Sequence, residues 1–196
     1  ALSDGAAAGL ADDQRPRDEG IDMPRPSSAV VTSAPARILL GLMRIAIGFV
    51  FLWGFLDKTF GLHFPTGPSR AWINGGTPAQ SFLTGATGGK PLASFFQALA
   101  IPAVDWVFML SLLGIGVALI LGIGTRLAAV GGVIMMGFMY AATAPWVWGS
   151  LNPVVSQHLV YAMVLALIPL TSAGDTLGLG ARWKKLSAVK KLPFLV

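Results

Sequence analysis

The stretch ILLGLMRIAIGFVFLWGFLDKTF, residues 38–60, decides the fold of this chain. It carries one charge in its interior, Arg44, and reaches the charged pair Asp57 and Lys58 only near its end. A helix needs about 20 predominantly apolar residues to cross the hydrocarbon core of a bilayer. A continuous apolar run, without the alternation of a barrel strand, therefore predicts a membrane-spanning helix.

Three further apolar segments follow, at about residues 104–124, 127–148 and 154–173. The connections between the second and third and between the third and fourth are short, and short connections make consecutive helices antiparallel neighbours. The sequence therefore predicts an all-α fold, an up-down four-helix transmembrane bundle over residues 37–180.

The composition agrees with a membrane protein and excludes several kinds of site. Of 196 residues, 54% are hydrophobic and 12% are charged, about half the charged share of a soluble domain. The absence of Cys excludes disulfides, iron–sulfur clusters, thiolate zinc sites and covalently attached haem. With only two His, we expect no metal site and no covalently bound cofactor.

Three segments lie outside the apolar runs. Residues 1–36 mix acidic, basic and Pro residues, and we expect them to be disordered or held by a partner. Residues 61–102 are long and rich in Gly and Pro, and we expect them to cap one end of the bundle, with short helices at about 69–74, 78–83 and 91–100. Residues 181–196 are basic and interleave apolar side chains, which predicts an interfacial segment on anionic phospholipid.

The basic residues predict the orientation in the membrane. Most of them fall in the tail, in the short turn at Arg126 and in the C-terminal segment, whereas Lys58, Arg70 and Lys90 fall on the other side. Because cytoplasmic loops are enriched in Lys and Arg, we expect a multi-pass protein of the cell (inner or plasma) membrane with both termini cytoplasmic. This placement explains the isoelectric point near 10.0 without a nucleic-acid partner.

One group of polar residues is a candidate site. The antiparallel topology brings Asp57, Lys58, Asp105 and His158 to the same outer level of the membrane. Asp57, Asp105 and His158 are the candidate catalytic groups. The candidates to line a pocket for a quinone or a lipid are Trp53, Lys58, Trp106 and Tyr161. The alternative is structural: solvated helix ends or an ion pair, with the Trp residues in the interfacial belt.

Two further features predict packing. Arg44 lies inside the first apolar segment, where it either pairs with Asp175 or extends its charged end to the interface, and we expect its role to be structural. Gly114, Ala118 and Gly122 are spaced four apart, which predicts a face for close packing of a neighbouring helix, either within the bundle or in a partner.

Several motifs resemble the DoxX/DoxD membrane family. They are RIAIGFVFLWGFLDKTFG at 44–61, LGIGVALILG at 113–122 with TR at 125–126, HLVY at 158–161 and AGDTLGLG at 173–180. The piece AWINGG at 71–76 resembles the subgroup labelled thiosulfate:quinone oxidoreductase large subunit. The residues that carry the family pattern are Arg44, Gly48, Gly54, Lys58, Gly122, Arg126 and Asp175. Ser156 and Gln157 stand where related sequences have acids before the matching His, which weakens a proton-relay role for His158.

The resemblance implies four transmembrane helices and a place among membrane redox complexes. Our first hypothesis is an accessory subunit of a respiratory or quinone-linked complex, without independent activity and bound to other membrane subunits. The alternative is the membrane subunit of a thiosulfate:quinone-type oxidoreductase with a quinone site at the outer interface. Such an enzyme would need sulfur chemistry without a Cys thiolate. A small-molecule carrier has less support, because the sequence shows no inverted repeat or broken helix.

Overall fold

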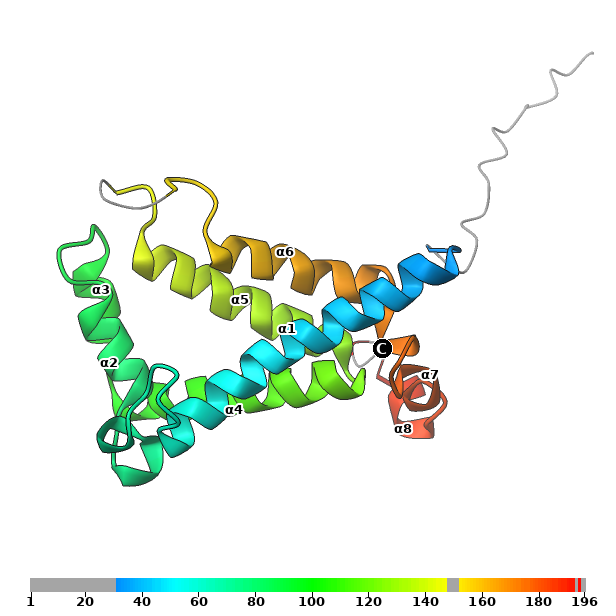
Figure 1. Cartoon of the computed structure of the whole chain (residues 1–196), viewed down its shortest axis with the longest axis horizontal. Helices are drawn as coiled ribbons and strands as arrows, with labels where there is room; N and C mark the ends of the chain where they lie inside the picture. Colours follow the sequence, from blue (N-terminus) through cyan, green and yellow to red (C-terminus); the bar gives the residue numbers. More distant parts are fainter. Residues whose placement is uncertain (1–30, 148–151, 193, 195–196) are drawn as a thin grey trace, which may run out of the picture.

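The computed structural model describes residues 31–147, 152–192 and 194 (Figure 1). Within these residues the chain is helical throughout and contains no strand. The long helices are α1 (Ala34–Phe60), α4 (Pro102–Leu121), α5 (Thr125–Thr143) and α6 (Gln157–Leu170). The prediction of an all-α protein is confirmed for the described part. The tail at 1–30 lies outside the described residues.

Three of the long helices are long and apolar enough to cross a membrane. The mean hydropathy of their best windows is 2.1 in α1, 2.3 in α4 and 1.4 in α5. The shortest of them, α5, has 19 residues and is about 28 Å long, against a bilayer core of about 30 Å. Gly61 and Gly122, both in the left-handed region, end α1 and α4.

The third and fourth apolar segments form shorter helices than we predicted. The helix α5 stops at Thr143 because Ala144 has φ 42° and a Pro follows it. The helix α6 begins only at Gln157, because Asn152 Oδ1 accepts the N–H groups of Val154 and Val155, each at 2.9 Å, and holds that stretch in a turn. With 14 residues, α6 is about 21 Å long, which is less than a bilayer core.

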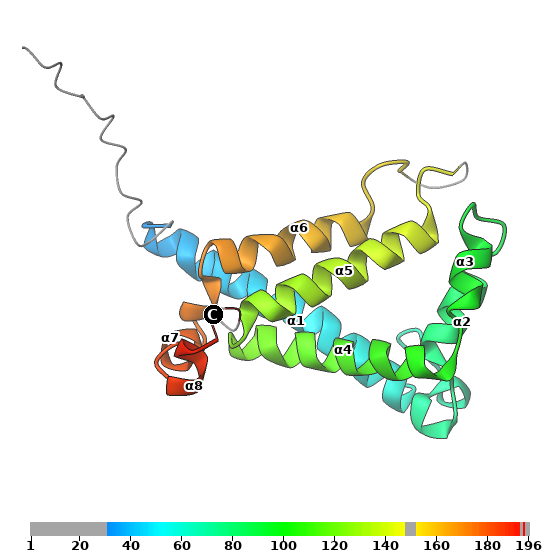
Figure 2. The same ribbon diagram turned by 180° about the vertical axis from the view of Figure 1, so that it is seen from behind.

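The four long helices form two pairs that diverge from one end (Figures 1 and 2). Helix α1 packs along α4, and α5 packs along α6. Helices α4 and α5 meet at the tight turn between them and then separate. Across the open side lie the short helices α2 (Pro78–Gly85) and α3 (Ala93–Ala98), preceded by 3-10 turns η1 (Pro68–Arg70) and η2 (Trp72–Asn74). The predicted short helices in the 61–102 segment are confirmed.

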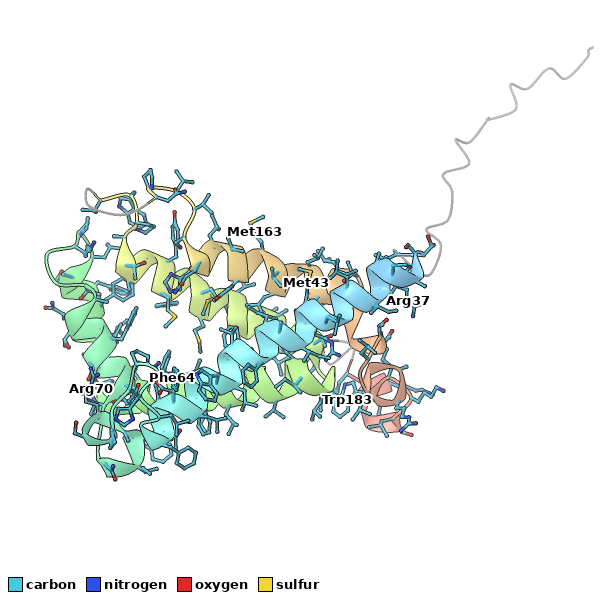
Figure 3. The ribbon with its side chains drawn as sticks, viewed as in Figure 1. Arg37, Met43, Phe64, Arg70, Met163 and Trp183 are labelled. Atoms are coloured by element: carbon cyan, nitrogen blue, oxygen red, sulfur yellow. The ribbon has the colours of Figure 1, made fainter. Side chains whose placement is uncertain are left out.

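The two ends of the bundle differ in character. Figure 3 shows Arg37 and Trp183 toward one end, and Phe64 and Arg70 at the other. We call the first the basic end, where α1 begins and where η3 (Ala173–Asp175), α7 (Gly180–Trp183) and α8 (Ser187–Lys190) follow α6. We call the other the loop end. The basic C-terminal segment, expected to be one amphipathic stretch, forms the two short helices α7 and α8 instead.

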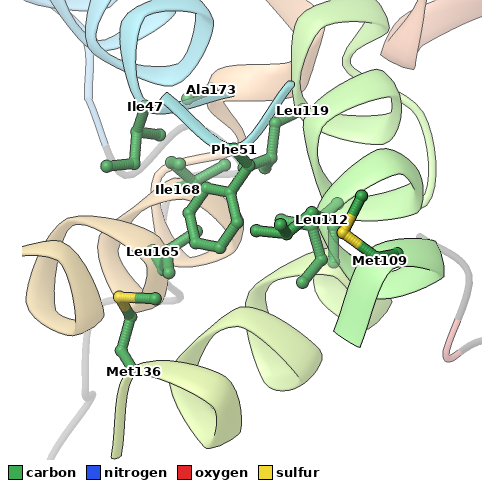
Figure 4. Close-up of a cluster of buried hydrophobic side chains, with 11 residues drawn as sticks. Ile47, Phe51, Met109, Leu112, Leu119, Met136, Leu165, Ile168 and Ala173 are labelled. Carbon is green, nitrogen blue, oxygen red and sulfur yellow. The ribbon is translucent and has the colours of Figure 1, made fainter. Parts of the chain in front are cut away.

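The core lies where the four long helices converge. Figure 4 shows the Phe51 ring among Leu112, Leu119, Leu165 and Ile168, all at most 6% exposed. Burying one such side chain contributes about 1.5–3 kcal/mol where water is the reference.

The close contact between α1 and α4 is made by residues other than those we predicted. A Cβ added at Gly116 would lie 2.7 Å from the Leu52 backbone N, and one at Gly48 would lie 2.9 Å from Leu119 Cβ. Gly114 has no atom near its Cβ position and is exposed, so it makes no close helix contact within the described residues, whereas Gly116 faces α1. A packing face of Gly114, Ala118 and Gly122 for a partner helix stays a prediction.

Candidate functional site

Arg44 is fully buried at the basic end and binds backbone carbonyls, not a carboxylate. Its guanidinium donates to Leu119 O, to Ile120 O at 3.0 Å, to Ala173 O at 3.2 Å and to Leu177 O at 2.9 Å. The last carbonyls of a helix have no partner within the helix. Here Arg44 satisfies those of Leu119 and Ile120, and the N–H of Leu179 binds Leu121 O at 2.8 Å.

Neither of the two predicted arrangements of Arg44 is found in the structure. Asp175 forms its ion pair with Lys184, Nζ to Oδ2 at 2.8 Å. The predicted pairing of Arg44 with Asp175 is absent among the described contacts, and the side chain does not reach the surface, because it is 0% exposed. Its role is structural, as expected. At Gly122, which has φ 74°, an added Cβ would lie 2.7 Å from the Gly174 backbone O and 3.0 Å from Arg44 Nη1.

Asp57 holds the start of the 61–102 segment. Its carboxylate, fully buried in the last turn of α1, accepts the backbone N–H of Phe64 at 2.7 Å and that of Thr66 at 3.0 Å. Hydrogen bonds to an ionised acceptor are stronger than neutral ones. Asp57 therefore fixes the chain where it leaves α1.

Asp105 holds the middle of the same segment. It lies in the first turn of α4, is 3% exposed, and accepts the backbone N–H of Ala79 at 2.7 Å and of Gln80 at 3.2 Å, and also the Gln80 side-chain amide. Ala79 and Gln80 are in the first turn of α2, where N–H groups lack partners within the helix. Asp105 thus acts as an N-cap supplied by another helix.

These contacts place the two candidate carboxylates outside the cavity beside them. That cavity, of about 220 Å³, lies at the loop end between all four long helices. Its polar lining is Lys58 from α1 and Gln157, His158 and Tyr161 from α6. Its apolar lining is Val50, Phe51, Gly54, Phe108, Leu112, Met136 and Met139. We call it the polar cavity.

The polar groups of this cavity have unused hydrogen-bonding capacity. His158 Nδ1 is buried and has no hydrogen-bond partner among the described residues. The Lys58 ammonium group makes no described hydrogen bond, and its described electrostatic partner is the neighbouring Asp57. Buried polar atoms are nearly always satisfied by protein or water, so an unpaired one needs an explanation.

A second, apolar cavity of about 390 Å³ adjoins the first. It lies in the wedge between α4 and α5, and α2 and α3 cover one side of it. We call it the apolar cavity, and it is lined by Ala79, Phe82, Leu83, Phe96, Leu99, Val104, Val107, Phe108, Ser111, Gly131, Ile134, Met135, Phe138 and Met139. Phe108 and Met139 line both cavities.

Trp53 and Trp106 do not line either cavity. Trp53 packs between Phe49 and Phe64, and Trp106 is 58% exposed and packs edge-on against Trp72, with ring centroids 4.6 Å apart. Trp side chains at this level of a membrane protein are common as interfacial anchors. Of the predicted pocket-lining residues, the structure brings together Lys58, Tyr161 and the candidate base His158.

Sequence reasoning missed the apolar side of the site. Phe108, Met136 and Met139 line the polar cavity, and none of them was among the predicted site residues. The available signal was the cluster of Met135, Met136 and Met139, because flexible thioethers suit surfaces that adapt to a ligand. Among the described residues no group of three or more His, Asp or Glu is placed to hold a metal ion.

Comparison with known proteins adds no identification. No family model, curated protein or solved structure matches this chain. The resemblance to the DoxX/DoxD family therefore depends on the motifs quoted above, and the function must be argued from the site.

Proposed function

We propose that this protein is a membrane subunit of a quinone-linked redox complex and that it holds a quinone, or a lipid of similar shape, at the loop end. The observation that carries this proposal is the pair of adjoining cavities, one with polar groups and one apolar, which share Phe108 and Met139. A molecule with a polar ring and an apolar tail matches both. Typical ligand pockets are about 300–1,000 Å³, mostly apolar, with a few placed polar groups.

The polar cavity supplies the groups that a quinone ring needs. The Lys58 ammonium and the Tyr161 hydroxyl are hydrogen-bond donors, and His158 donates from whichever ring nitrogen carries the proton. Each can donate to a ring carbonyl oxygen. The tail would lie in the apolar cavity, past Phe108 and Met139, and so continue toward the lipid between α4 and α5.

The proposed role is to hold the quinone, while a neighbouring subunit exchanges electrons with it. Asp57 and Asp105 are engaged by backbone N–H groups of the 61–102 segment, which leaves His158 as the remaining candidate for proton exchange. A protein that holds the quinone while a neighbouring subunit exchanges electrons with it fits the accessory hypothesis better than the alternative, a thiosulfate:quinone-type oxidoreductase. The accessory role predicts no thiosulfate-dependent quinol formation by the purified chain, and turnover would refute it.

The proposal includes the topology of the chain in the membrane. We propose that α6, with the extended residues before it, forms a fourth crossing of the cell membrane, so that the bundle is up-down with both termini cytoplasmic. The distribution of basic residues between the two ends supports this orientation.

Filling the polar cavity tests the quinone proposal. Gly54 lines this cavity, and an added Cβ would meet only Leu112 side-chain atoms, at 3.9 Å. Gly54→Leu should weaken binding of a short-tailed quinone analogue, followed by equilibrium dialysis in detergent, at least tenfold. Gly114→Leu, on the exposed face of α4, is the matched control and should bind normally. Equal binding by both variants would contradict the proposal.

A further inference from the structure

The segment at residues 61–102, which we call the cap, carries large apolar side chains on its surface. Phe64 is 67% exposed, Ile73 62% and Phe95 53%, although these residues lie outside the long helices. Exposed apolar side chains that gather in this way mark a contact with a membrane or with another protein. The aromatic contacts and the charge of the cap favour the membrane.

Aromatic side chains join the cap to the outer faces of α1 and α4. On α1, Phe64 packs edge-on against Trp53, and Trp53 stacks on Phe49, with ring centroids 5.7 and 5.8 Å apart. On α4, Trp72 of the cap packs against the exposed Trp106. Because Trp side chains are enriched where a bilayer meets water, these three Trp residues place the cap at that level.

A similar chain of rings joins the cap to α5. Phe95 packs against Phe96, and Phe96 packs against Phe138 of α5, with ring centroids 5.2 and 6.3 Å apart. Phe49 and Phe138 are about half exposed, on helices long and apolar enough to cross a membrane. The exposed rings of the cap are therefore continuous with the surface that those helices would turn toward acyl chains.

The charge of the cap agrees with phospholipid head groups. The cap contains no Asp or Glu, and its Lys and Arg residues are Arg70 and Lys90. Arg70 donates to Pro65 O at 3.0 Å, and neither cation pairs with a carboxylate within the described part of the chain. Asp57 and Asp105, the acids nearest in sequence, are buried and accept backbone N–H groups. A surface that is both positive and apolar suits a layer of phosphates above acyl chains.

Helix α2 has a polar face as well as an apolar one. Ser81 and Thr84 are exposed, whereas Ala79 and Leu83 are buried and line the apolar cavity. Hydroxyl groups are costly to place in hydrocarbon, so this outer face belongs in water. Figures 1 and 2 show α2 and α3 lying across the loop end, which is where such a boundary would run.

We propose that the cap lies in the head-group layer of the membrane, with Phe64 and Phe95 inserted among the acyl chains. Arg70 and Lys90 lie at the level of the phosphates, and the outer face of α2 remains in water. The cap thus covers the apolar cavity on the water side, and the wedge between α4 and α5 faces the lipid.

The test is site-directed spin labelling of single-Cys variants in phospholipid vesicles, since the chain has no native Cys. Phe64→Cys and Phe95→Cys carry the label at the two points of insertion, and Thr84→Cys is the matched control on the polar face of α2. Oxygen concentrates in hydrocarbon, whereas the neutral complex nickel ethylenediaminediacetate stays in water. We expect the ratio of oxygen to nickel collisions to be high at positions 64 and 95 and low at position 84.

Two other results would overturn the proposal. A ratio at positions 64 and 95 as low as that at 84 would place the cap in water. Few collisions with either reagent at 64 and 95 would mean that a protein, such as a second copy of this chain, covers the cap. The two positions lie in different parts of the cap, so if circular dichroism shows that one variant is misfolded, the other still decides.

A charge variant tests the contact with phosphates. Near an anionic lipid surface each Lys or Arg is worth about fivefold in binding, so Lys90→Gln should raise the ratio of lifted to inserted cap about fivefold in vesicles that contain phosphatidylglycerol. Nickel collisions at position 95 would increase accordingly. Arg182→Gln removes the same charge at the basic end and should leave those collisions unchanged. An unchanged ratio in Lys90→Gln would refute the contact with phosphates.

The cap proposal and the quinone proposal are separable. Gly54→Leu fills the polar cavity, where an added Cβ meets Leu112 of α4 and no atom of the cap, so it should not change the collisions at position 95. Failure of quinone binding would therefore leave the position of the cap standing, and the reverse also holds.

Discussion

At the scale of single residues, Arg44 joins three parts of the chain that are far apart in sequence. It ties α1 to the last turn of α4 and to the turn that follows α6, through carbonyls at residues 119, 120, 173 and 177. A cation at the C-terminal end of a helix also interacts favourably with the helix dipole. The buried charge of Arg44 is tolerated because its Nε, Nη1 and Nη2 groups each donate to a backbone carbonyl.

Arg44→Met should therefore be strongly destabilising. Removing one side of a buried charged network costs about 3–5 kcal/mol, because the carbonyls left behind lose their donors. Chemical unfolding in mixed micelles would measure the loss, with the exposed Arg182→Met as the control. Arg44→Lys should recover part of the stability, since an ammonium cannot reach all the carbonyls. A loss below about 1 kcal/mol would show that the carbonyls find other donors.

Asp105 controls the 61–102 segment through α2. Asp105→Ala removes the acceptor for the N–H groups of Ala79 and Gln80, a capping loss of about 1–2 kcal/mol. The open fraction of the segment should rise about tenfold, and chymotrypsin cleavage next to Phe82 should accelerate to the same degree. Asp175→Asn, at the basic end, should leave that cleavage rate unchanged. An unchanged rate in Asp105→Ala would mean that the α2–α3 packing alone holds the segment.

At the scale of elements, the α1–α4 contact depends on which face of α4 is small. Gly116→Ala places a methyl group 2.7 Å from the Leu52 backbone N and should cost about 1–3 kcal/mol through overpacking. Gly114→Ala, two positions earlier, meets nothing and should be neutral or slightly stabilising, because Ala favours the helix by about 0.5–1 kcal/mol. Thermal unfolding of both variants in detergent compares them directly, and the reverse order would refute the observed register.

The elements themselves were largely predictable, because apolar length and Gly or Pro positions are local signals. The ends of α5 and α6 were not: they depend on the backbone at Ala144 and on the Asn152 side-chain turn. The partners of Arg44, Asp57 and Asp105 were also missed. Each charged group binds backbone N–H or carbonyl groups. Nearly every residue type carries these groups, so the sequence does not show which residues will be the partners. His158 and Lys58 could be placed together because helix topology sets their level.

At the scale of the whole molecule, the loop end and the basic end have different structural roles. At the loop end, Asp57 and Asp105 hold a cap against α1 and α4, and the cavities open beneath it. At the basic end, Arg44 ties α1 to the last turn of α4 and to the turn that follows α6. The proposed quinone thus lies where the helix pairs diverge and leave apolar surface uncovered.

This division makes the orientation directly testable, because the chain has no native Cys. Gly88→Cys places a thiol on the exposed loop end, and Ser187→Cys places one on the exposed basic end. A membrane-impermeant maleimide added to intact spheroplasts should label Gly88→Cys, and it should label Ser187→Cys only after the membrane is opened. The opposite pattern would invert the proposed orientation. Labelling of both in intact spheroplasts would place Ser187 on the same side of the membrane as the loop end, so that α6 does not complete a fourth crossing.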